Sequence, residues 1–338
     1  ELSGGVSNVV LHVKRGEGRG VDFVLKQARE QLRVKEPWYC SVQRIWREVE
    51  VLRVCAAALT RSASEASSKD ALALRVGVSV PRILFEDREN FCFTMTAAPP
   101  GHRTWKQDLL SGEFNAEIAR ACGDLLGRLH AATWQAPEIA ERIADRTFFD
   151  DLRVAPYYRH VASGHAGLRE PIEKLIRSLD DHPRCLVHGD FSPKNLLIWN
   201  EAELPAPSNL MLIDCEVGHF GDPAFDLGFF LSHLVLKSVY LHDAVVIARN
   251  TNPLDLADEF LATYFRIVGS SIPRKECEEL KRRATSNLAG CLMARVDGKS
   301  PVEYLTAPTQ KDAVRTIARR LFEKSGDVQE VIATLRLR

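Results

Sequence analysis

The sequence predicts an α+β fold with two lobes, a small N-terminal lobe rich in strands and a larger C-terminal lobe made mainly of helices. Short β-rich runs dominate the first hundred residues, whereas apolar residues recur at helical spacing over most of the remainder. Between the two patterns lies AAPPGHR at residues 97–103, whose prolines lack the main-chain donor that a strand requires. We therefore expect the first lobe at residues 1–98 and the second at residues 99–338.

In the N-terminal lobe, β-rich runs alternate with turn residues, and one helical pattern interrupts them. Residues 42–59 repeat apolar side chains at helical spacing and predict a helix, and the small, polar residues 60–70 predict an exposed loop. The chain does not begin with Met and opens in what resembles the middle of a hairpin, so we expect another strand before residue 1. The strands are expected at residues 8–13, 21–26, 81–87 and 90–96.

The C-terminal lobe is expected to be helical apart from one β-pair. Residues 116–133 place apolar side chains on one face of a helix, and residues 195–199 and 209–214 predict the two paired strands. The next helix begins after Asp222, a residue type favoured at the N-cap, and Pro223, which suits the first helical position. Its body is apolar almost all round, so we expect it to be buried.

Composition limits the function before any motif is considered. The 45 basic and 45 acidic residues balance, which argues against nucleic acid as a main partner. The eight cysteines form no CxxC pair and suit a reducing cytoplasm rather than a zinc site or a disulfide framework. The most apolar stretch, residues 225–239, is too short to cross a bilayer, so we expect no membrane association. We expect a cytoplasmic monomer or homodimer.

The segment LVHGDFSPKNLLIWN at residues 186–200 is the strongest candidate for a site. Taken alone, its Gly, Asp, Ser, Pro and Asn residues also suit a plain turn. The β-pair that follows brings the strand after Asn195 against the strand that ends at Asp214, so these two side chains can converge. Carboxylate and amide oxygens at one point suit Mg²⁺. Asp190 would be the free carboxylate beside the ion, able to orient and deprotonate a hydroxyl nucleophile for phosphoryl transfer.

Main-chain groups of the N-terminal lobe are candidates for nucleotide binding. Gly4 and Gly5, followed closely by Ser7, lie at a strand turn where N–H groups can approach phosphates without a Cβ in the way. A turn with two glycines is, however, more often only a turn. At the hinge between the lobes, we expect the main chain from about Thr96 to Ala98 to hydrogen-bond adenine.

A lysine and a glutamate in the same lobe form a second candidate pair. Lys26 ends a predicted strand, and Glu48 lies on the helix that follows it. A strand lysine paired with a helix glutamate positions the phosphates of ATP in the kinase fold. Glu50 is the alternative partner on the same helix.

Together, these motifs resemble the aminoglycoside phosphotransferase and choline kinase group, small-molecule kinases with the protein-kinase-like fold. HGDFSPKN and IDCEVGHFGDPAFDLG carry the resemblance, which runs from residue 2 to about residue 304. It implies ATP, Mg²⁺ and a small-molecule hydroxyl substrate, with Asp190 as base and Asn195 and Asp214 as metal ligands. His188 and Asp226 match positions that brace the catalytic loop, the segment at residues 188–195. Asp226 lies on an apolar helix and must find donors, since an unpaired buried charge costs several kcal/mol. The main chain of the catalytic loop is the expected source of these donors.

Within this group, Asp-Cys-Glu at residues 214–216, the GGVSN loop and CLMARVDG are most similar to methylthioribose kinases. Methylthioribose kinases lack an Asn in the loop after His-Gly-Asp, whereas this chain has Asn195 there. Of the paired arginines of that family only one is matched here, by Arg295, which the resemblance suggests as a substrate residue. If the strand continues past Asp214, Glu216 faces the same side and can bind metal. If the strand ends there, Glu216 caps the next turn or binds the acceptor.

Three other functions are weighed against a small-molecule kinase. A catalytically silent nucleotide-binding protein of kinase shape is disfavoured because the lysine, the base and the metal aspartate are all present. A protein kinase is disfavoured because Gly189 and Ser192 replace residues typical of that family. An aminoglycoside phosphotransferase should line its acceptor groove with carboxylates. The acidic candidates are Glu216, Asp243, Asp255, Asp258 and Glu259, against Arg249 and Arg266.

Overall fold

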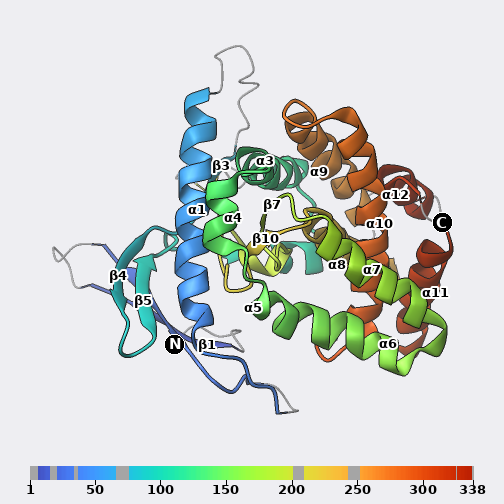
Figure 1. The fold of residues 1–338 in the computed structure, drawn as a ribbon, viewed down its shortest axis with the longest axis horizontal. Helices are drawn as coiled ribbons and strands as arrows, with labels where there is room; N and C mark the ends of the chain where they lie inside the picture. The colour runs from blue at the N-terminus through green and yellow to red at the C-terminus, as the bar shows by residue number, and fades with distance from the viewer. Residues whose placement is uncertain are drawn as a thin grey trace.

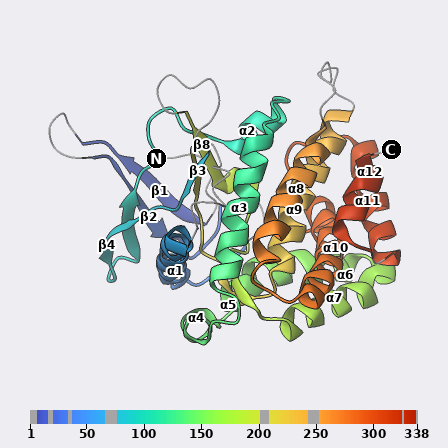
Figure 2. The same cartoon turned by 90° about the horizontal axis from the view of Figure 1, so that it is seen from above.

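The structure, a computed structural model, describes residues 7–15, 21–33, 37–65, 76–200, 209–242, 252–324 and 326–336 of the chain. Strands β1, β2, β4 and β5 gather with helix α1 on one side of the molecule, and the C-terminal helices form the other side (Figure 1). The second view shows the same division, with α3 between the strand-rich part and helices α8 to α12 (Figure 2). The α+β prediction is therefore confirmed.

The N-terminal part is an antiparallel sheet in the order β1-β2-β5-β4, covered on one face by α1. Lys26 pairs with Phe93 across the β2–β5 register, and Val24 pairs with Met95. All four residues are buried, so Lys26 lies on the apolar inner face of the sheet. The elements are β1 (Asn8–Val13), β2 (Phe23–Ala28), β4 (Ile83–Asp87), β5 (Cys92–Thr96) and α1 (Arg44–Glu65).

Helix α1 extends further than the sequence pattern predicts. Residues 60–65 are helical, whereas a loop was expected at residues 60–70, and residues 66–70 lie outside the described residues. The Thr60 hydroxyl donates to the carbonyl of Ala56 at 2.9 Å, one turn earlier. Ser, Thr, Ala and Glu each lower helix stability by no more than a few tenths of a kcal/mol. The packing at the start of α1 is therefore enough to keep its polar end helical.

Two further sheets connect the parts of the chain. One has the order β3-β9-β8-β6, and in it β3, from the N-terminal segment, pairs in parallel with β9. The other pairs β7 with β10 beside the catalytic loop. The prediction of a single β-pair here was wrong, because strands of two or three residues are too short to give a periodic pattern. The strands are β3 (Gly77–Ser79), β6 (Arg103–Thr104), β7 (Cys185–Val187), β8 (Leu196–Trp199), β9 (Asn209–Leu212) and β10 (His219–Gly221).

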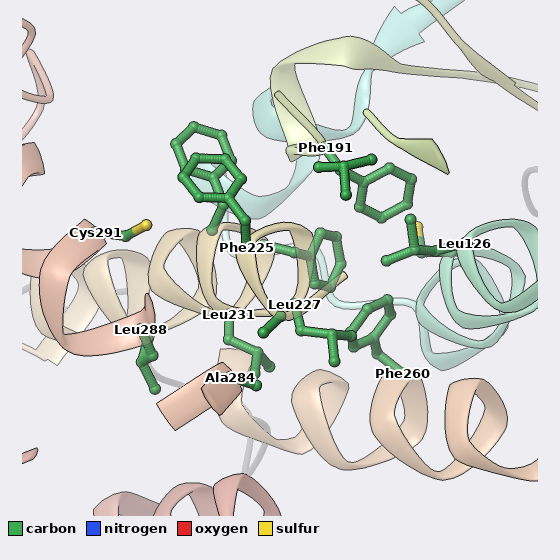
Figure 3. Close-up of a cluster of buried hydrophobic side chains, with 14 of the residues drawn as sticks. Leu126, Phe191, Phe225, Leu227, Leu231, Phe260, Ala284, Leu288 and Cys291 are labelled. Atoms are coloured by element: carbon green, nitrogen blue, oxygen red, sulfur yellow. The ribbon is translucent and has the colours of Figure 1, made fainter. Parts of the chain in front are cut away.

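The remaining described elements are helical, and α8 lies at their centre against α9 and α10. Phe230 of α8 packs against Phe260 of α9, with ring centroids 4.2 Å apart, and against Phe191 of the predicted catalytic loop, at 5.3 Å. Phe225, Leu227 and Leu231 of α8 belong to the same buried cluster (Figure 3). The helices are α2 (Trp105–Leu110), α3 (Ala116–Ala132), α4 (Pro137–Ile143), α5 (Thr147–Phe149), a π-helix (Asp150–Arg159), α6 (His160–Gly164), α7 (Arg169–Asp181), α8 (Ala224–His242), α9 (Pro253–Val268), α10 (Arg274–Asp297), α11 (Pro308–Glu323) and α12 (Val328–Arg336).

Helix α8 begins as the sequence predicts, since the Asp222 carboxylate accepts from the main-chain N–H of Ala224 at 3.0 Å. It is longer than expected and, by length and composition alone, could cross a membrane. The prediction that this stretch is too short was therefore wrong. However, 83% of its apolar window is buried inside the fold, as in the core helix of a folded domain.

The contact between α8 and α10 allows a test of this packing. A Cβ on Gly228 of α8 would lie 2.5 Å from the main-chain nitrogen of Leu288, which cannot move without displacing α10. Overpacking of this kind costs roughly 1–3 kcal/mol. We therefore expect Gly228→Ala to lower the free energy of unfolding by about 2 kcal/mol in urea denaturation. Gly167→Ala is the matched control, because its Cβ would meet no atom within 4 Å. Equal stability of the two variants would contradict this packing.

Candidate active site

The catalytic loop turns sharply at Gly189, directly after β7. Gly189 has φ +75°, and a Cβ there would lie 2.9 Å from Cγ2 and 3.0 Å from the carbonyl oxygen of Val217. Only glycine combines this left-handed backbone with such a close approach. The turn directs the next residue, Asp190, away from the strand, and its side chain is buried.

Asp226 holds this turn in place from the first turn of α8. Its two carboxylate oxygens accept the main-chain N–H groups of His188 at 2.7 Å and Gly189 at 2.8 Å. A third polar neighbour is the ring of His130, at 3.3 Å. Asp226 is fully buried, so these donors replace the water that the charge has lost. The sequence required donors for this carboxylate, and they are the main-chain groups that were expected.

His188 connects the catalytic loop to the segment after β9. Its Nδ1 accepts the main-chain N–H of Asp190 at 3.1 Å, so that nitrogen carries no proton. Its Nε2 is therefore the donor to the carbonyl of Ile213, at 3.2 Å. Both ring nitrogens are used in positioning the loop, which favours a structural role over an acid or base role.

The hairpin brings Asn195 and Asp214 together as the sequence predicts. The main-chain N–H of Ile213 donates to the carbonyl of Asn195 at 3.0 Å, just before β8 and β9 pair. The Asn195 side-chain amide donates to the main-chain oxygen of Asp190 at 2.9 Å and to its carboxylate at 2.8 Å. The predicted base, Asp190, and both predicted metal ligands therefore lie in one connected group.

Two cations contact the Asp190 carboxylate, and the sequence did not identify the first. Arg153, on the π-helix, lies 3.0 Å from Asp190 and also donates to the Gly189 carbonyl at 2.8 Å. Lys194 lies 2.8 Å from the same carboxylate. Burial raises the pKa of Asp190, but these cations outweigh it and leave the pKa below its usual range. Arg153 lies in a segment interrupted by Pro156, with no motif to mark it, so only the fold reveals its position.

Lys26 forms a buried ion pair with Glu48, at 2.7 Å, and a second ion pair with Asp214 at 2.5 Å. Burial lowers the pKa of Lys26, but the carboxylates of Asp214, Glu48 and Glu216 raise it above its usual range, so the lysine stays charged. Glu50, the alternative partner, instead pairs with Arg142 on the surface at 2.6 Å.

Glu216 does not lie on a continued strand, so of the two alternatives the one in which it shares a face with Asp214 does not hold. Strand β9 ends at Leu212, and Asp214 has φ +69°, which breaks the alternation of side chains. The Glu216 carboxylate accepts from Ser7 at 2.6 Å, Asn8 at 2.9 Å and Arg44 at 3.2 Å. Both of its oxygens are therefore used to join the loop after β9 to the start of β1 and of α1. Ser7, predicted to bind ATP, is one of these partners.

The remaining predicted residues lie as follows. Thr96 ends β5, and its main-chain N–H already donates to Arg82 at 2.9 Å. Ala98 is buried, and its main chain has no hydrogen-bond partner among the described residues. Arg295 lies on α10 and donates to the hydroxyl of Tyr157 at 3.1 Å. Gly4 and Gly5 lie outside the described residues.

The donor set of Asn195 and Asp214 fits a hard divalent cation. The Asn195 amide nitrogen is directed at Asp190, so its oxygen is the atom left for a ligand. Burial raises the pKa of Asp214, but Lys26 and Lys194 lower it well below its usual range, so the carboxylate is ionised. Oxygen donors of these two kinds suit Mg²⁺, which takes few protein ligands and keeps water and phosphate oxygens in its shell.

Cavity size alone would misplace the site. A cavity of about 1090 Å³ lies between the C-terminal end of α8 and helices α11 and α12, lined by residues such as Val235, Ile317 and Val331. None of the predicted catalytic or metal residues lines it. The convergence of charged side chains therefore locates the chemistry better than volume does.

Comparison with known proteins shows the family and the fold of this chain. The family model described as the phosphotransferase enzyme family matches residues 1–265. Methylthioribose kinase from Citrobacter koseri is 26% identical over 166 residues, 40% of this chain and 39% of that protein. The chain thus matches well under half the length of this relative.

Two solved structures share the fold. A choline/ethanolamine kinase family protein from Mesorhizobium loti has a TM-score of 0.50 at 16% identity, covering 99% of this chain and 91% of that one. Ethanolamine kinase from Plasmodium vivax has a TM-score of 0.52 at 13% identity, covering 96% and 84%. Identities this low show a common fold only, and they confirm the predicted kinase-like architecture. The fold of this chain and the family match over residues 1–265 together show that the chain belongs to the phosphotransferase enzyme family.

Proposed function

We propose that this chain transfers the γ-phosphate of ATP to a hydroxyl group of a small molecule, with Asp190 as the base. The observation that carries the proposal is the connected network of Lys26, Asp214, Asn195 and Asp190. These side chains match the phosphate-positioning, metal-binding and nucleophile-orienting parts of a phosphoryl-transfer site. A silent nucleotide-binding protein is the weaker alternative, because none of these parts is missing.

In the reaction, the acceptor oxygen forms a bond to the γ-phosphorus while the bond from that phosphorus to the β–γ bridging oxygen breaks. The hydroxyl proton passes to the Asp190 carboxylate, and ADP and a phosphate monoester are the products. The low pKa of Asp190 makes it a weak base. Phosphoryl transfer needs mainly positioning and charge neutralisation, so a well-held, ionised carboxylate is sufficient.

The N-terminal lobe would hold the nucleotide. Lys26 remains charged and is held by Glu48, so it can contact the phosphates without losing its position. Adenine would bind the main chain near Ala98, whose polar groups lack partners among the described residues. Mg²⁺, held by Asn195 and Asp214, would neutralise phosphate charge when bound.

The acidic side chains do not favour an aminoglycoside as the acceptor, because a polycation would need unpaired carboxylates to bind it. Of the acidic candidates, Asp255 and Asp258 pair with Arg336, and Glu259 pairs with Arg120. Glu216 is held by Arg44, and Asp243 lies outside the described residues. No free acidic groove for a polycation is formed by the described members of this set. A methylthioribose-type sugar kinase stays a candidate through the similarity of one part of the chain.

Replacing the base tests the reaction itself. Asp190→Asn keeps the shape of the side chain but cannot accept the proton, so we expect turnover to fall about 1000-fold. ADP release with the best acceptor from a panel of sugars and alcohols measures this loss. Stabilisation by MgATP in a thermal-shift assay should persist in the variant. Turnover above one tenth of the wild-type rate would contradict the assignment of Asp190.

The Lys26 partner can be tested with a matched pair of variants. Glu48→Gln weakens a buried charge-assisted hydrogen bond, worth roughly 1.5–3 kcal/mol, so we expect the KM for ATP to rise about 10-fold or more. Glu50→Gln removes only a surface ion pair and should leave this KM within about 2-fold. An unchanged KM in Glu48→Gln, or an equal rise in both variants, would remove Glu48 from the nucleotide site.

Replacing Glu216 distinguishes a structural role of this residue from a role in metal binding. Glu216→Gln leaves Arg44 buried without its charged partner, so we expect the free energy of unfolding to fall by about 2–3 kcal/mol. The Mg²⁺ concentration for half-maximal rate should stay within about 2-fold, since both carboxylate oxygens are engaged by protein donors. Urea denaturation and Mg²⁺ titration measure the two effects. A higher Mg²⁺ requirement with unchanged stability would instead support the metal role that the sequence suggested.

A further inference from the structure

Helix α8 carries a line of buried side chains that leads away from the catalytic loop. Asp226, which holds the loop, is followed at helical spacing by Phe229, His233 and Lys237. Residues three or four apart lie on the same face of a helix. All four are buried, so this face of α8 connects the catalytic loop to a lysine deep in the C-terminal part.

Lys237 has no charged partner among the described residues. Its side chain belongs to a residue only 1% exposed, and its ammonium donates weakly to the His233 carbonyl at 3.3 Å in the same helix. Its other neighbour is the ring of Tyr304, at 5.3 Å. Buried lysines are almost always paired, because an uncompensated charge costs several kcal/mol. The described fold retains this lysine without the partner that such a position normally has.

The groups that surround Lys237 add to the positive charge. Burial, together with Lys106 from α2 and Arg295 from α10, lowers the pKa of Lys237 to about 7, whereas Glu303 acts in the opposite direction. Glu303 already pairs with Lys106. Around neutral pH the ammonium is therefore only partly protonated, and a nearby anion would restore its charge.

Three polar atoms near this lysine are also buried without hydrogen-bond partners in the described part of the chain. They are Nε2 of His233, the hydroxyl of Tyr304 and Nε of Arg295. The tyrosine hydroxyl and the arginine N–H are donors, and the imidazole can become one. Buried donors without partners are uncommon in folded proteins. Here these donors lie near a lysine that has no anionic partner among the described residues.

This group is continuous with the proposed base. Arg153, which contacts Asp190, lies 5.6 Å from the ring centre of Tyr157 and 5.8 Å from that of Phe229. Phe229 in turn packs against the ring of His233, with centroids 5.0 Å apart. Three further cations of this region reach solvent: Lys106 and Arg295 are half-buried, and Lys194 is exposed.

We propose that the acceptor is an anionic hydroxyl compound whose carboxylate or phosphate is bound by Lys237, Lys106 and Arg295 while its hydroxyl lies at Asp190. The inference rests on the proposed function and narrows its substrate class. An ammonium-bearing acceptor would meet five cationic side chains and two carboxylates. The cations are Lys106, Arg153, Lys194, Lys237 and Arg295, and the carboxylates are Asp190 and Glu303.

Anion binding can be measured without turnover. With saturating MgADP to fill the nucleotide site, sulfate and D-glycerate are titrated at constant ionic strength, as tetrahedral and carboxylate probes. We expect at least one to raise the Tm by 2 °C or more at pH 6.5. Its affinity should fall up to 10-fold per pH unit above pH 7, as the free Lys237 ammonium loses its proton. The side chains that surround the Lys237 ammonium are those of His233, Lys106, Arg295, Glu303 and Tyr304. Comparison with a Lys237 variant therefore shows how much of the pH dependence comes from Lys237 itself.

Lys237→Met is the decisive variant, and Lys275→Met is the control, because Lys275 is an α10 lysine whose side chain is 88% exposed. We expect Lys237→Met to raise the Tm in the absence of anions and to abolish the response to both probes. Lys106→Met, which removes a half-exposed charge, should weaken binding at least 5-fold and serves if Lys237→Met misfolds. Equal responses in wild type, Lys237→Met and Lys106→Met, or no response in wild type, would overturn the proposal.

Pairs of acceptors with and without an anionic group then distinguish the anionic-acceptor proposal from the kinase proposal. ADP release is compared for D-glycerate against glycerol, for ribose 5-phosphate against ribose, and for ethanolamine. A preference of at least 100-fold for an anionic member, lost in Lys237→Met, would support the inference and show which anion is used. Transfer to ribose or ethanolamine that Lys237→Met leaves unchanged would overturn it while the kinase proposal stands. Anion binding that depends on Lys237, without MgATP binding or transfer to any acceptor, would retain the anion site and refute the kinase proposal.

Discussion

The site depends on a single buried carboxylate. Asp226 accepts two consecutive main-chain N–H groups from the catalytic loop, and these donors replace the water that the buried charge has lost. The left-handed turn at Gly189, the direction of Asp190 and the position of His188 all follow from this contact. Because Asp226 belongs to the most buried helix of the fold, the packing of α8 is transmitted directly to the proposed base.

Charge connects the N-terminal strands to the catalytic loop. Lys26 contacts both Glu48 of its own lobe and Asp214 of the other, and Arg44 contacts Glu216 in the same way. These contacts are buried or half-buried, where charges attract more strongly than in water. Removing either carboxylate would therefore affect the relative position of the lobes as well as local chemistry. This explains why Glu216, two positions after the predicted metal ligand Asp214, has structural partners.

Around Lys237 the charges are arranged differently. There, cations outnumber carboxylates, and Lys237 is buried at a cost to stability that the described fold does not offset. Functional sites commonly retain such unfavourable groups because a ligand completes them. The two charged groups thus differ: the group at Lys26 and Asp214 is paired within the protein, whereas Lys237 has no anionic partner among the described residues.

The sequence by itself determined the fold class and the hairpin that carries Asn195 and Asp214, because both are marked by local residue patterns. It named Lys26 and Glu48 but left Glu50 open as the alternative partner, and the tertiary structure decided between the two glutamates. The sequence did not determine the very short strands, whose two or three residues carry no periodicity. Nor could it place Arg153 or Lys237, since their meaning comes from neighbours distant in the chain. The role of Glu216 was decided by one backbone angle at Asp214, which ended the alternation of the strand. Local patterns specify elements and motifs, whereas the burial of a charge and the identity of its partners exist only once the chain is folded.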